Sequence, residues 1–328
     1  MDTAVATALR GQLIDRRRRL EDSLRETGQV NDLVALLQQV DAALSRMEDH
    51  TYGGCKVCGE TVEEPYLLAN PFLEYCLCRL DEKQMTALQH DIDLARRIQA
   101  GLLPRQDLEC CGWLAHYRYE AAGPVSGDYC DILSAKNGEG DLYFTMADVS
   151  GKGISAALLM AHLNASFRSL IDVGLPLSEI VARQNRMFLA TGLPSHYATL
   201  VLGRADGDGG LEICNAGHVP PLLLREGEVQ AVGTTGFPVG MVGDRSYEVV
   251  RVSLEPGDSL FLYTDGLVEA RGAADVEFGE DRLKKLLHQN RRLAPRALAD
   301  ACLADLRAHL DGVPHTDDMT LMVVRRES

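Results

Sequence analysis

The stretch Tyr143-Phe-Thr-Met-Ala-Asp-Val-Ser-Gly-Lys-Gly-Ile154 decides the fold of this 328-residue chain. Its apolar first half, with aromatic and β-branched residues, predicts a buried strand that ends on Asp148. The following Ser150-Gly-Lys-Gly153 predicts a turn, and small and apolar residues at helical spacing predict a helix from Ile154 to Leu170. A carboxylate at the tip of a strand, followed by a glycine turn, is held rigidly at an edge where a ligand can meet it.

The same arrangement recurs at three other places. Gly127-Asp128 follows the segment 119–125, Asp265-Gly266 follows the apolar stretch 259–264, and Asp317-Asp318 precedes the apolar stretch 319–324. Asp and Gly favour turns by themselves, so each of these acids can be explained as a turn residue without a ligand. Four such acids, each joined to a strong strand, favour a centre for a hard divalent cation such as Mg²⁺ or Mn²⁺, which prefers oxygen ligands.

Composition sets the broad class. The chain has 48 acidic and 33 basic residues and a net charge of −15, which argues against a protein that coats nucleic acid. Its length favours two domains, and the 46% of hydrophobic residues can form a sizeable core. No continuous apolar run of membrane-spanning length and no signal-peptide pattern is present, so we expect a cytoplasmic protein without a membrane segment. Its nine cysteines then indicate metal ligands or buried thiols.

The first 49 or so residues read as two helices, with a break at Thr27-Gly-Gln29. The first helix carries a basic run, Arg16 to Arg19. We interpret this run as a solvated face whose apolar stems lie on the neighbouring helix, in preference to a nucleic-acid contact.

Two cysteine pairs follow. Cys55 and Cys58 form a CxxC pair, and Cys76 and Cys78 form a CxC pair. Four thiolates at this separation suit a tetrahedral structural Zn²⁺ site, although a single spacer residue is a poorer fit than two. The alternatives are four buried thiols or a redox pair without metal.

The segment from Val40 to Gly59, ending in Gly-Gly-Cys-Lys-Val-Cys-Gly, resembles the DksA/TraR zinc-finger family. The resemblance covers roughly residues 1–80 and implies a helical hairpin that leads into a four-cysteine finger. It departs from the family in its CxC pair and in a short hairpin without an obvious acidic tip. The resemblance makes RNA polymerase a candidate partner of this module.

Residues 81–104 read as a linker helix that ends at Pro104. Its apolar positions alternate by three and four like the seam of a coiled coil, at Met85, Leu88, Ile92, Ala95, Gln99 and Leu102. Packing of this seam onto its own domain is one alternative. Because the helix joins two domains, we favour a parallel homodimer stalk that carries a signal.

Residues 105–328 show short strands and glycine-rich turns, with helices added in blocks. Strands are predicted at 113–120, 141–147, 197–203, 211–215, 221–224, 250–254, 259–264 and 319–324, and helices at 155–170, 178–189, 282–289 and 295–310. This order predicts an α+β domain with two layers of antiparallel strands. His218 lacks a nucleophile elbow such as GxSxG elsewhere in the chain, so we interpret it as structural and not as a catalytic base.

The domain resembles PPM-type metal-dependent Ser/Thr phosphatases of the bacterial SpoIIE/RsbU class. The resemblance spans residues 94–325 and rests on motifs in a fixed order, which are Leu94–Pro104, Pro124–Asp131, Ala147–Met160, Asn215–Pro221, Gly236–Gly240, Tyr263–Ala270 and Asp317–Thr320. One departure is Ser126, where the family usually has a second glycine, and this removes backbone freedom beside Asp128.

The resemblance implies a PPM-type antiparallel β-sandwich flanked by helices, with two Mn²⁺ or Mg²⁺ ions at one end. Asp128 is expected to bridge the two ions. The backbone carbonyl of Val149 is expected to bind one of them, and Asp265 and Asp317 the other. Asp148 is expected to support the site through water or a weaker third metal.

Two further roles follow from the resemblance. Asp318 is a weaker candidate ligand than Asp317, although a swap stays open. Asp128 and Asp265 are the catalytic candidates, and either Asp265 or a metal-bound water relays the proton. Two cations about 3.5–4 Å apart activate a shared water and stabilise charge on the phosphoryl oxygens, so that no covalent nucleophile from the protein is needed.

The sequence therefore predicts a protein serine/threonine phosphatase. By resemblance, its substrate is a phosphorylated anti-anti-sigma factor of the STAS type. We further hypothesise that residues 1–80 control the phosphatase domain at 105–328 through the linker helix. The alternative is an interaction protein that binds RNA polymerase through the finger and uses the phosphatase fold as a scaffold.

Overall fold

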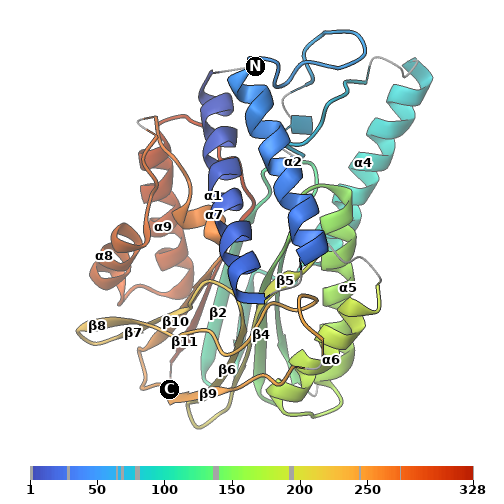
Figure 1. Cartoon of the computed structure of the whole chain (residues 1–328). Helices are drawn as coiled ribbons and strands as arrows, with labels where there is room; N and C mark the ends of the chain where they lie inside the picture. Colours follow the sequence, from blue (N-terminus) through green and yellow to red (C-terminus); the bar gives the residue numbers. More distant parts are fainter. Residues whose placement is uncertain are drawn as a thin grey trace.

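The computed structural model describes residues 3–327 with the exception of 28–29, 64–65, 68–69, 78–81, 136–139, 192–195, 244 and 274. Helices α1 (Thr3–Thr27) and α2 (Val30–Glu48) lie side by side and lead into the cysteine-containing segment, and α4 (Glu82–Leu102) joins that segment to a β-rich domain (Figure 1). Apolar residues of the two helices meet in a shared cluster that includes Leu13, Leu20, Val40 and Ala43.

The strands of the described residues form two antiparallel sheets. The six-stranded sheet has the order β1-β2-β11-β10-β7-β8 and the five-stranded sheet the order β3-β4-β5-β6-β9. The strands are β1 Asp107–Cys110, β2 Trp113–Glu120, β3 Asp128–Ser134, β4 Leu142–Val149, β5 Ala198–Ala205, β6 Gly210–Ala216, β7 Leu222–Arg225, β8 Glu228–Ala231, β9 Val250–Ser253, β10 Ser259–Tyr263 and β11 Met319–Arg326.

The two sheets pack on each other through one core. Side chains from both sheets contribute to it, among them Trp113, Phe144, Met146, Leu262 and Met322. All five residues of β10 are buried, because the strand faces the opposite sheet on one side and helices on the other. Burial on both faces explains why the central strands read as continuous apolar runs rather than as alternating ones.

Helices cover the outer face of each sheet (Figure 1). Helices α5 (Ile154–Ile171) and α6 (Leu177–Leu189) pack on the five-stranded sheet, and α8 (Glu280–Asn290) and α9 (Pro295–Leu310) pack on the six-stranded sheet. Among the described helices, only α5 is long and apolar enough to span a membrane, and it is a core helix of this layer. The architecture is the predicted helix-flanked sandwich.

Most predicted elements are observed within two residues of their predicted bounds, but one part of the prediction is wrong. Asp128 was expected at the tip of a strand over 119–125. The strand β2 instead ends at Glu120, and Asp128 is the first residue of β3, which was not predicted. The edge strands β1 and β8 were also missed, because they are four residues long and mostly exposed.

Helix α4 contacts the sandwich mainly through its C-terminal end. The amide of Asn164 on α5 donates to the carbonyl of Leu102 at 3.2 Å, and Gln99 is buried against the loop before β3. Further toward the N-terminus of α4, the side chains of Leu94 and Ile98 are 42% and 58% exposed. In Figure 1 this part of α4 rises away from the sheets.

Candidate metal centre

Acids from both sheets meet at one edge of the sandwich. Asp128 opens β3 and Asp148 lies near the end of β4, and the two residues are direct partners in the antiparallel register. In the other sheet, Asp265 follows β10 and begins the single-turn helix α7 (Asp265–Val268), while Asp317 and Asp318 immediately precede the neighbouring strand β11. The register of two strand pairs therefore brings together residues that are far apart in sequence.

Asp128 is held by hydroxyl groups from the opposite sheet. Thr264 Oγ1 and Thr320 Oγ1 donate to its Oδ2 at 2.9 and 2.6 Å. The backbone N–H of Asp128 donates to Ser126 Oγ at 3.0 Å. The serine that replaces the usual glycine thus helps to fix the first residue of β3, and neither threonine was identified from the sequence.

The acids form a cluster whose charge is poorly compensated inside the protein. Burial raises the pKa of Asp128 and Asp148 well above the usual range, and neighbouring carboxylates, Asp318 for the first and Asp265 for the second, raise it further. Burial and Asp317 also raise the pKa of Asp318. A desolvated group of carboxylates needs a cation in order to stay ionised, and carboxylate oxygens are the donors that Mg²⁺ and Mn²⁺ prefer. The donor set therefore fits a divalent metal centre.

The two neighbouring acids before β11 have different surroundings. Asp318 accepts hydrogen bonds from the backbone N–H groups of Ala122 and Gly127, one on each carboxylate oxygen, both at 2.9 Å. Asp317 is 37% exposed and pairs with Lys152 Nζ at 2.8 Å. Asp318 thus shapes the loop before Asp128, whereas Asp317 faces the pocket.

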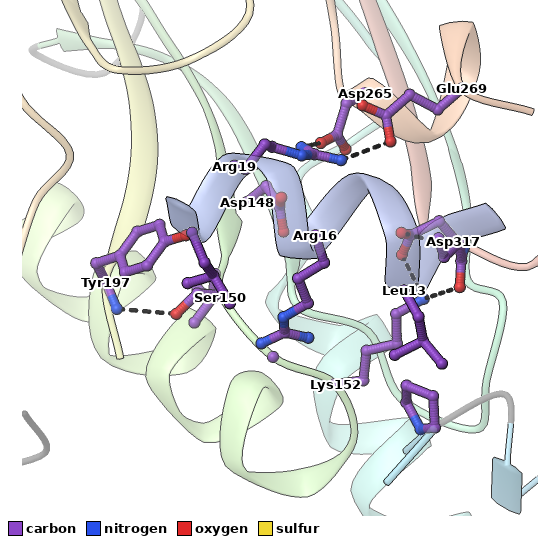
Figure 2. Close-up of a pocket in the computed structure, with 15 residues that line it drawn as sticks. Leu13, Arg16, Arg19, Asp148, Ser150, Lys152, Tyr197, Asp265, Glu269 and Asp317 are labelled. Carbon is purple, nitrogen blue, oxygen red and sulfur yellow. Dashed lines mark hydrogen bonds and ion pairs between the residues drawn. The ribbon is translucent and has the colours of Figure 1, made fainter. Parts of the chain in front are cut away.

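Three of these acids, Asp148, Asp265 and Asp317, line a cavity of about 110 Å³. Figure 2 shows Asp148, Asp265 and Asp317 around this cavity, with helix α1 crossing it. The carbonyl oxygen of Val149 lies 3.0 Å from the point that a side-chain carbon on Gly127 would occupy. A larger residue at Gly127 would therefore crowd this carbonyl, which the resemblance assigns to metal binding.

Glu269 is a pocket residue that sequence reasoning missed. It lies one helical turn after Asp265, and burial, with the charge of Asp265, raises its pKa to about 7. Arg19 of α1 bridges these two acids, with Nη1 2.6 Å from Asp265 Oδ2 and Nη2 2.6 Å from Glu269 Oε2. Glu269 belongs to the motif Tyr263–Ala270, so its place in that motif could have identified it as a candidate site residue.

The interpretation of the basic run as a solvated face is wrong for two of its four residues. Arg16 and Arg19 line the cavity (Figure 2). Arg17 pairs with Asp41 of α2 at 3.0 Å, and Arg18 is 72% exposed at its side chain. Helical spacing places positions three apart on one face, so the run is divided between the pocket and the surface.

His218 has the structural role expected from the sequence. Its side chain is buried, and burial lowers its pKa to about 4. Nδ1 lies 2.7 Å from Thr199 Oγ1, and Nε2 lies 3.1 Å from the carbonyl oxygen of Tyr263. A neutral imidazole that donates to Tyr263 satisfies both contacts and supports the strand that leads to Asp265.

The predicted zinc ligands are brought together as far as the structure describes them. The Sγ atoms of Cys55, Cys58 and Cys76 all lie within 4.8 Å of one another, and Cys78 lies outside the described residues. Backbone N–H groups, that of Cys58 first, lower the pKa of the Cys55 thiol to about 6. Gly59, at a φ of 76°, turns the chain beside this group. Three converging thiols, one with thiolate character, fit a zinc ion.

Two helix-covered sheets with acids gathered at one edge define a class of fold, that of PP2C (PPM-type) phosphatase domains. The SiaA-PP2C domain of Pseudomonas aeruginosa shares this fold, with a TM-score of 0.63 and 21% identity over 74% of this chain and 98% of that one. The family model of stage II sporulation protein E (SpoIIE) matches residues 138–327, and the chain belongs to this family. The model of the prokaryotic dksA/traR C4-type zinc finger matches residues 50–78.

Several known proteins are similar to about seven tenths of this chain. Phosphoserine phosphatase RsbU of Bacillus subtilis is 26% identical over 73% of this chain and 71% of its own length. Protein IcfG of Synechocystis is 28% identical over 72% of this chain. The matched region is 41% of the length of IcfG. A solved structure of the RsbU and RsbW domains of Rv1364c from Mycobacterium tuberculosis has a TM-score of 0.57 at 26% identity, over 69% of this chain and 62% of that one.

Proposed function

We propose that this chain is a metal-dependent protein serine/threonine phosphatase. The observation that carries the proposal is the convergence of Asp148, Asp265 and Asp317 at one cavity, with the buried Asp128 paired to Asp148 in the strand register, in a chain of the SpoIIE family. The match to phosphoserine phosphatase RsbU supports the same activity.

Asp128, Asp148, Asp265, Asp317 and the carbonyl of Val149 would hold two Mn²⁺ or Mg²⁺ ions. When bound, these ions supply an activated water and neutralise charge on the phosphoryl group. We assign Asp318 to shaping of the loop, because its oxygens already accept two backbone N–H groups.

The remaining residues of the site orient these ligands. Thr264 and Thr320 fix one oxygen of Asp128, which leaves the carboxylate little freedom to rotate. Lys152 donates to Asp317 and to the carbonyl oxygen of Thr316, both at 2.8 Å, and so ties the turn after β4 to the loop before β11. Ligands held in place before binding lose little freedom when a cation and a phosphate arrive.

We propose a phosphorylated anti-anti-sigma protein of the STAS type as the substrate, in the cytoplasm. Support comes from the similarity to RsbU and to the Bacillus subtilis phosphatase RsbP, both described as phosphoserine phosphatases. The alternative of a polymerase-binding scaffold has less support, because Arg16 and Arg19 of the basic run line the pocket and Arg19 is paired with Asp265 and Glu269.

We further propose that residues 1–80 control the site through α4, as part of a homodimer. Gln99 on α4 makes two hydrogen bonds to the backbone of Ser126, which lies two residues before Asp128. A shift of α4 would thus reach the first metal ligand directly. The exposed Leu94 and Ile98 leave apolar surface on α4 for a second copy.

The proposal is tested by Mn²⁺-dependent phosphate release from a phosphoserine peptide. We expect release from the wild type, and loss of at least a hundredfold in Asp265→Asn, about the size of effect that removing one preorganised electrostatic group has in other enzymes. Asp208→Asn, in the exposed turn between β5 and β6, is the matched control and is expected to retain activity. Equal rates in both variants would refute the assignment of the site.

A further inference from the structure

One face of helix α1 closes the mouth of the catalytic cavity. Five of its residues line that cavity, namely Gln12, Leu13, Arg16, Arg19 and Leu20. Figure 2 shows the helix crossing in front of Asp148, with the guanidinium of Arg19 directed at Asp265 and Glu269. The face is largely polar and basic where it meets the acids, which makes it complementary in charge to the site.

The contacts of α1 fall on the acids that are proposed to hold one cation. Arg19 binds Asp265 at 2.6 Å, and the amide of Gln12 donates to Asp317 Oδ2 at 3.4 Å. Between these two residues, Asp15 pairs with Arg271 at 3.2 Å. A guanidinium at hydrogen-bonding distance from Asp265 competes with a metal ion for the same carboxylate, since both are cations that need its oxygens.

The N-terminal part of α1 packs on the zinc-finger segment. The cluster that fixes the first half of the helix consists of Val5, Leu9, Cys55, Val62 and Leu67. One of its members, Cys55, is a proposed zinc ligand. The hairpin core with α2 holds the second half of the helix. A single helix thus connects the finger to the metal centre.

We propose that α1 is an autoinhibitory helix, in which Arg19 takes the place of a metal ion at Asp265 and the zinc finger holds the helix there. The inference rests on the proposed metal-dependent activity and names the regulation of that site. Release of α1 frees Asp265, Glu269 and Asp317 and opens the cavity to a phosphoprotein. Since the side chain of Arg19 is 51% exposed, its ion pairs are weak enough to be exchanged for a metal ion.

The test is titration of the full-length, zinc-loaded chain with Mn²⁺ by calorimetry, which does not depend on turnover. We expect Arg19→Ala to bind Mn²⁺ roughly fivefold more tightly than the wild type, a change of the size of one exposed ion pair. Arg18→Ala is the matched control, because this neighbouring arginine pairs only with Asp15 among the described residues. It is expected to bind Mn²⁺ like the wild type.

Hydrogen exchange gives a second readout on the same proteins. Saturating Mn²⁺ should increase exchange across residues 9–20 of the wild type, because the metal displaces the helix. Cys58→Ser should raise Mn²⁺ affinity in the same direction as Arg19→Ala, because it loosens the finger that holds α1.

The outcomes separate the inference from the proposed function. If Asp128→Asn weakens Mn²⁺ binding but Arg19→Ala binds like the wild type and α1 stays protected, the metal centre stands and the autoinhibitory role is refuted. If the wild type, Arg19→Ala and Asp128→Asn all fail to bind Mn²⁺, the proposed function itself fails. If Arg19→Ala binds more tightly and Cys58→Ser does not, the finger is not what holds the helix.

Discussion

Gln99 is the point at which the linker helix α4 is joined to the metal centre. Its buried side chain donates to the carbonyl oxygen of Ser126 at 2.7 Å and accepts from the N–H of Ser126 at 3.0 Å. Substitution of Gln99 by Met keeps the length and most of the volume of the side chain but removes both hydrogen bonds. The variant therefore isolates this connection from effects of cavity formation.

The size of the effect follows from the two groups left without partners. An unsatisfied buried N–H or C=O costs about 1–3 kcal/mol, so loss of both partners in Gln99→Met should lower the free energy of unfolding by about 2–6 kcal/mol. Ser126 Oγ in turn accepts a hydrogen bond from the N–H of Asp128. Because the substitution frees the backbone of Ser126, it should also loosen Asp128 and weaken Mn²⁺ binding.

Urea unfolding followed by fluorescence measures the first effect, since the single tryptophan, Trp113, lies in the core between the sheets. Calorimetric titration with Mn²⁺ measures the second. Gln89→Met is the matched control on an exposed turn of the same helix, where a surface substitution should change stability by less than about 0.5 kcal/mol. Identical unfolding midpoints and Mn²⁺ affinities for the two variants would refute the reasoning.

Three further changes test other parts of the structure. Thr320→Val removes the hydroxyl that lies 2.6 Å from Asp128 Oδ2, and loss of a hydrogen bond to a charged group, worth about 1.5–3 kcal/mol, should lower Mn²⁺ affinity roughly tenfold or more in calorimetry. Gly203→Ala places a carbon 2.0 Å from Phe144 Cζ in the core, so overpacking should cost at least about 1–3 kcal/mol in urea unfolding. His218, with a folded pKa of about 4, stays neutral in the native state, so its stabilising contribution is present above pH 6.5 and is lost as the pH falls. From pH 7 to pH 5 this loss is about 2 kcal/mol, and His218→Asn should lack it.

Each of these predictions has its own control. Thr320→Ser keeps the hydroxyl and should bind Mn²⁺ like the wild type. Gly207→Ala adds a carbon in a turn with no neighbour within 4 Å and should leave stability unchanged. For the histidine, the readout is the difference in pH dependence between variant and wild type, because the raised pKa values of the clustered acids act in the opposite direction. His90→Asn, at an exposed position, should leave the dependence of the free energy of unfolding on pH as it is in the wild type. If His218→Asn also leaves it unchanged, His218 is not the source of the predicted loss of stability.

The local sequence predicts those parts of the fold that local chemistry controls. Strands β4 and β10 carry long apolar runs that end at Asp148 and just before Asp265, so both strands and both acids were identified. The resemblance carried by the motifs around these acids also implied that they lie together at one end of the sandwich. That they share a cavity depends on strand register between distant segments.

What the sequence could not predict depends on contacts between distant residues. Asp128 was expected to follow a strand, but its loop takes its shape from Asp318, whose carboxylate binds two backbone N–H groups of that loop. Arg19 lies in a run of four arginines with the same local signal. Only the packing of α1 on the finger and on α2 selects which arginine faces Asp265.

The central claim is that the clustered acids form a metal centre for protein dephosphorylation. Its most direct test is phosphate release from a STAS-domain protein phosphorylated on serine, with and without Mn²⁺, for the wild type and for Asp128→Asn. We expect release that requires Mn²⁺ in the wild type and is lost in the variant. Release that continues without metal, or that Asp128→Asn retains, would contradict it.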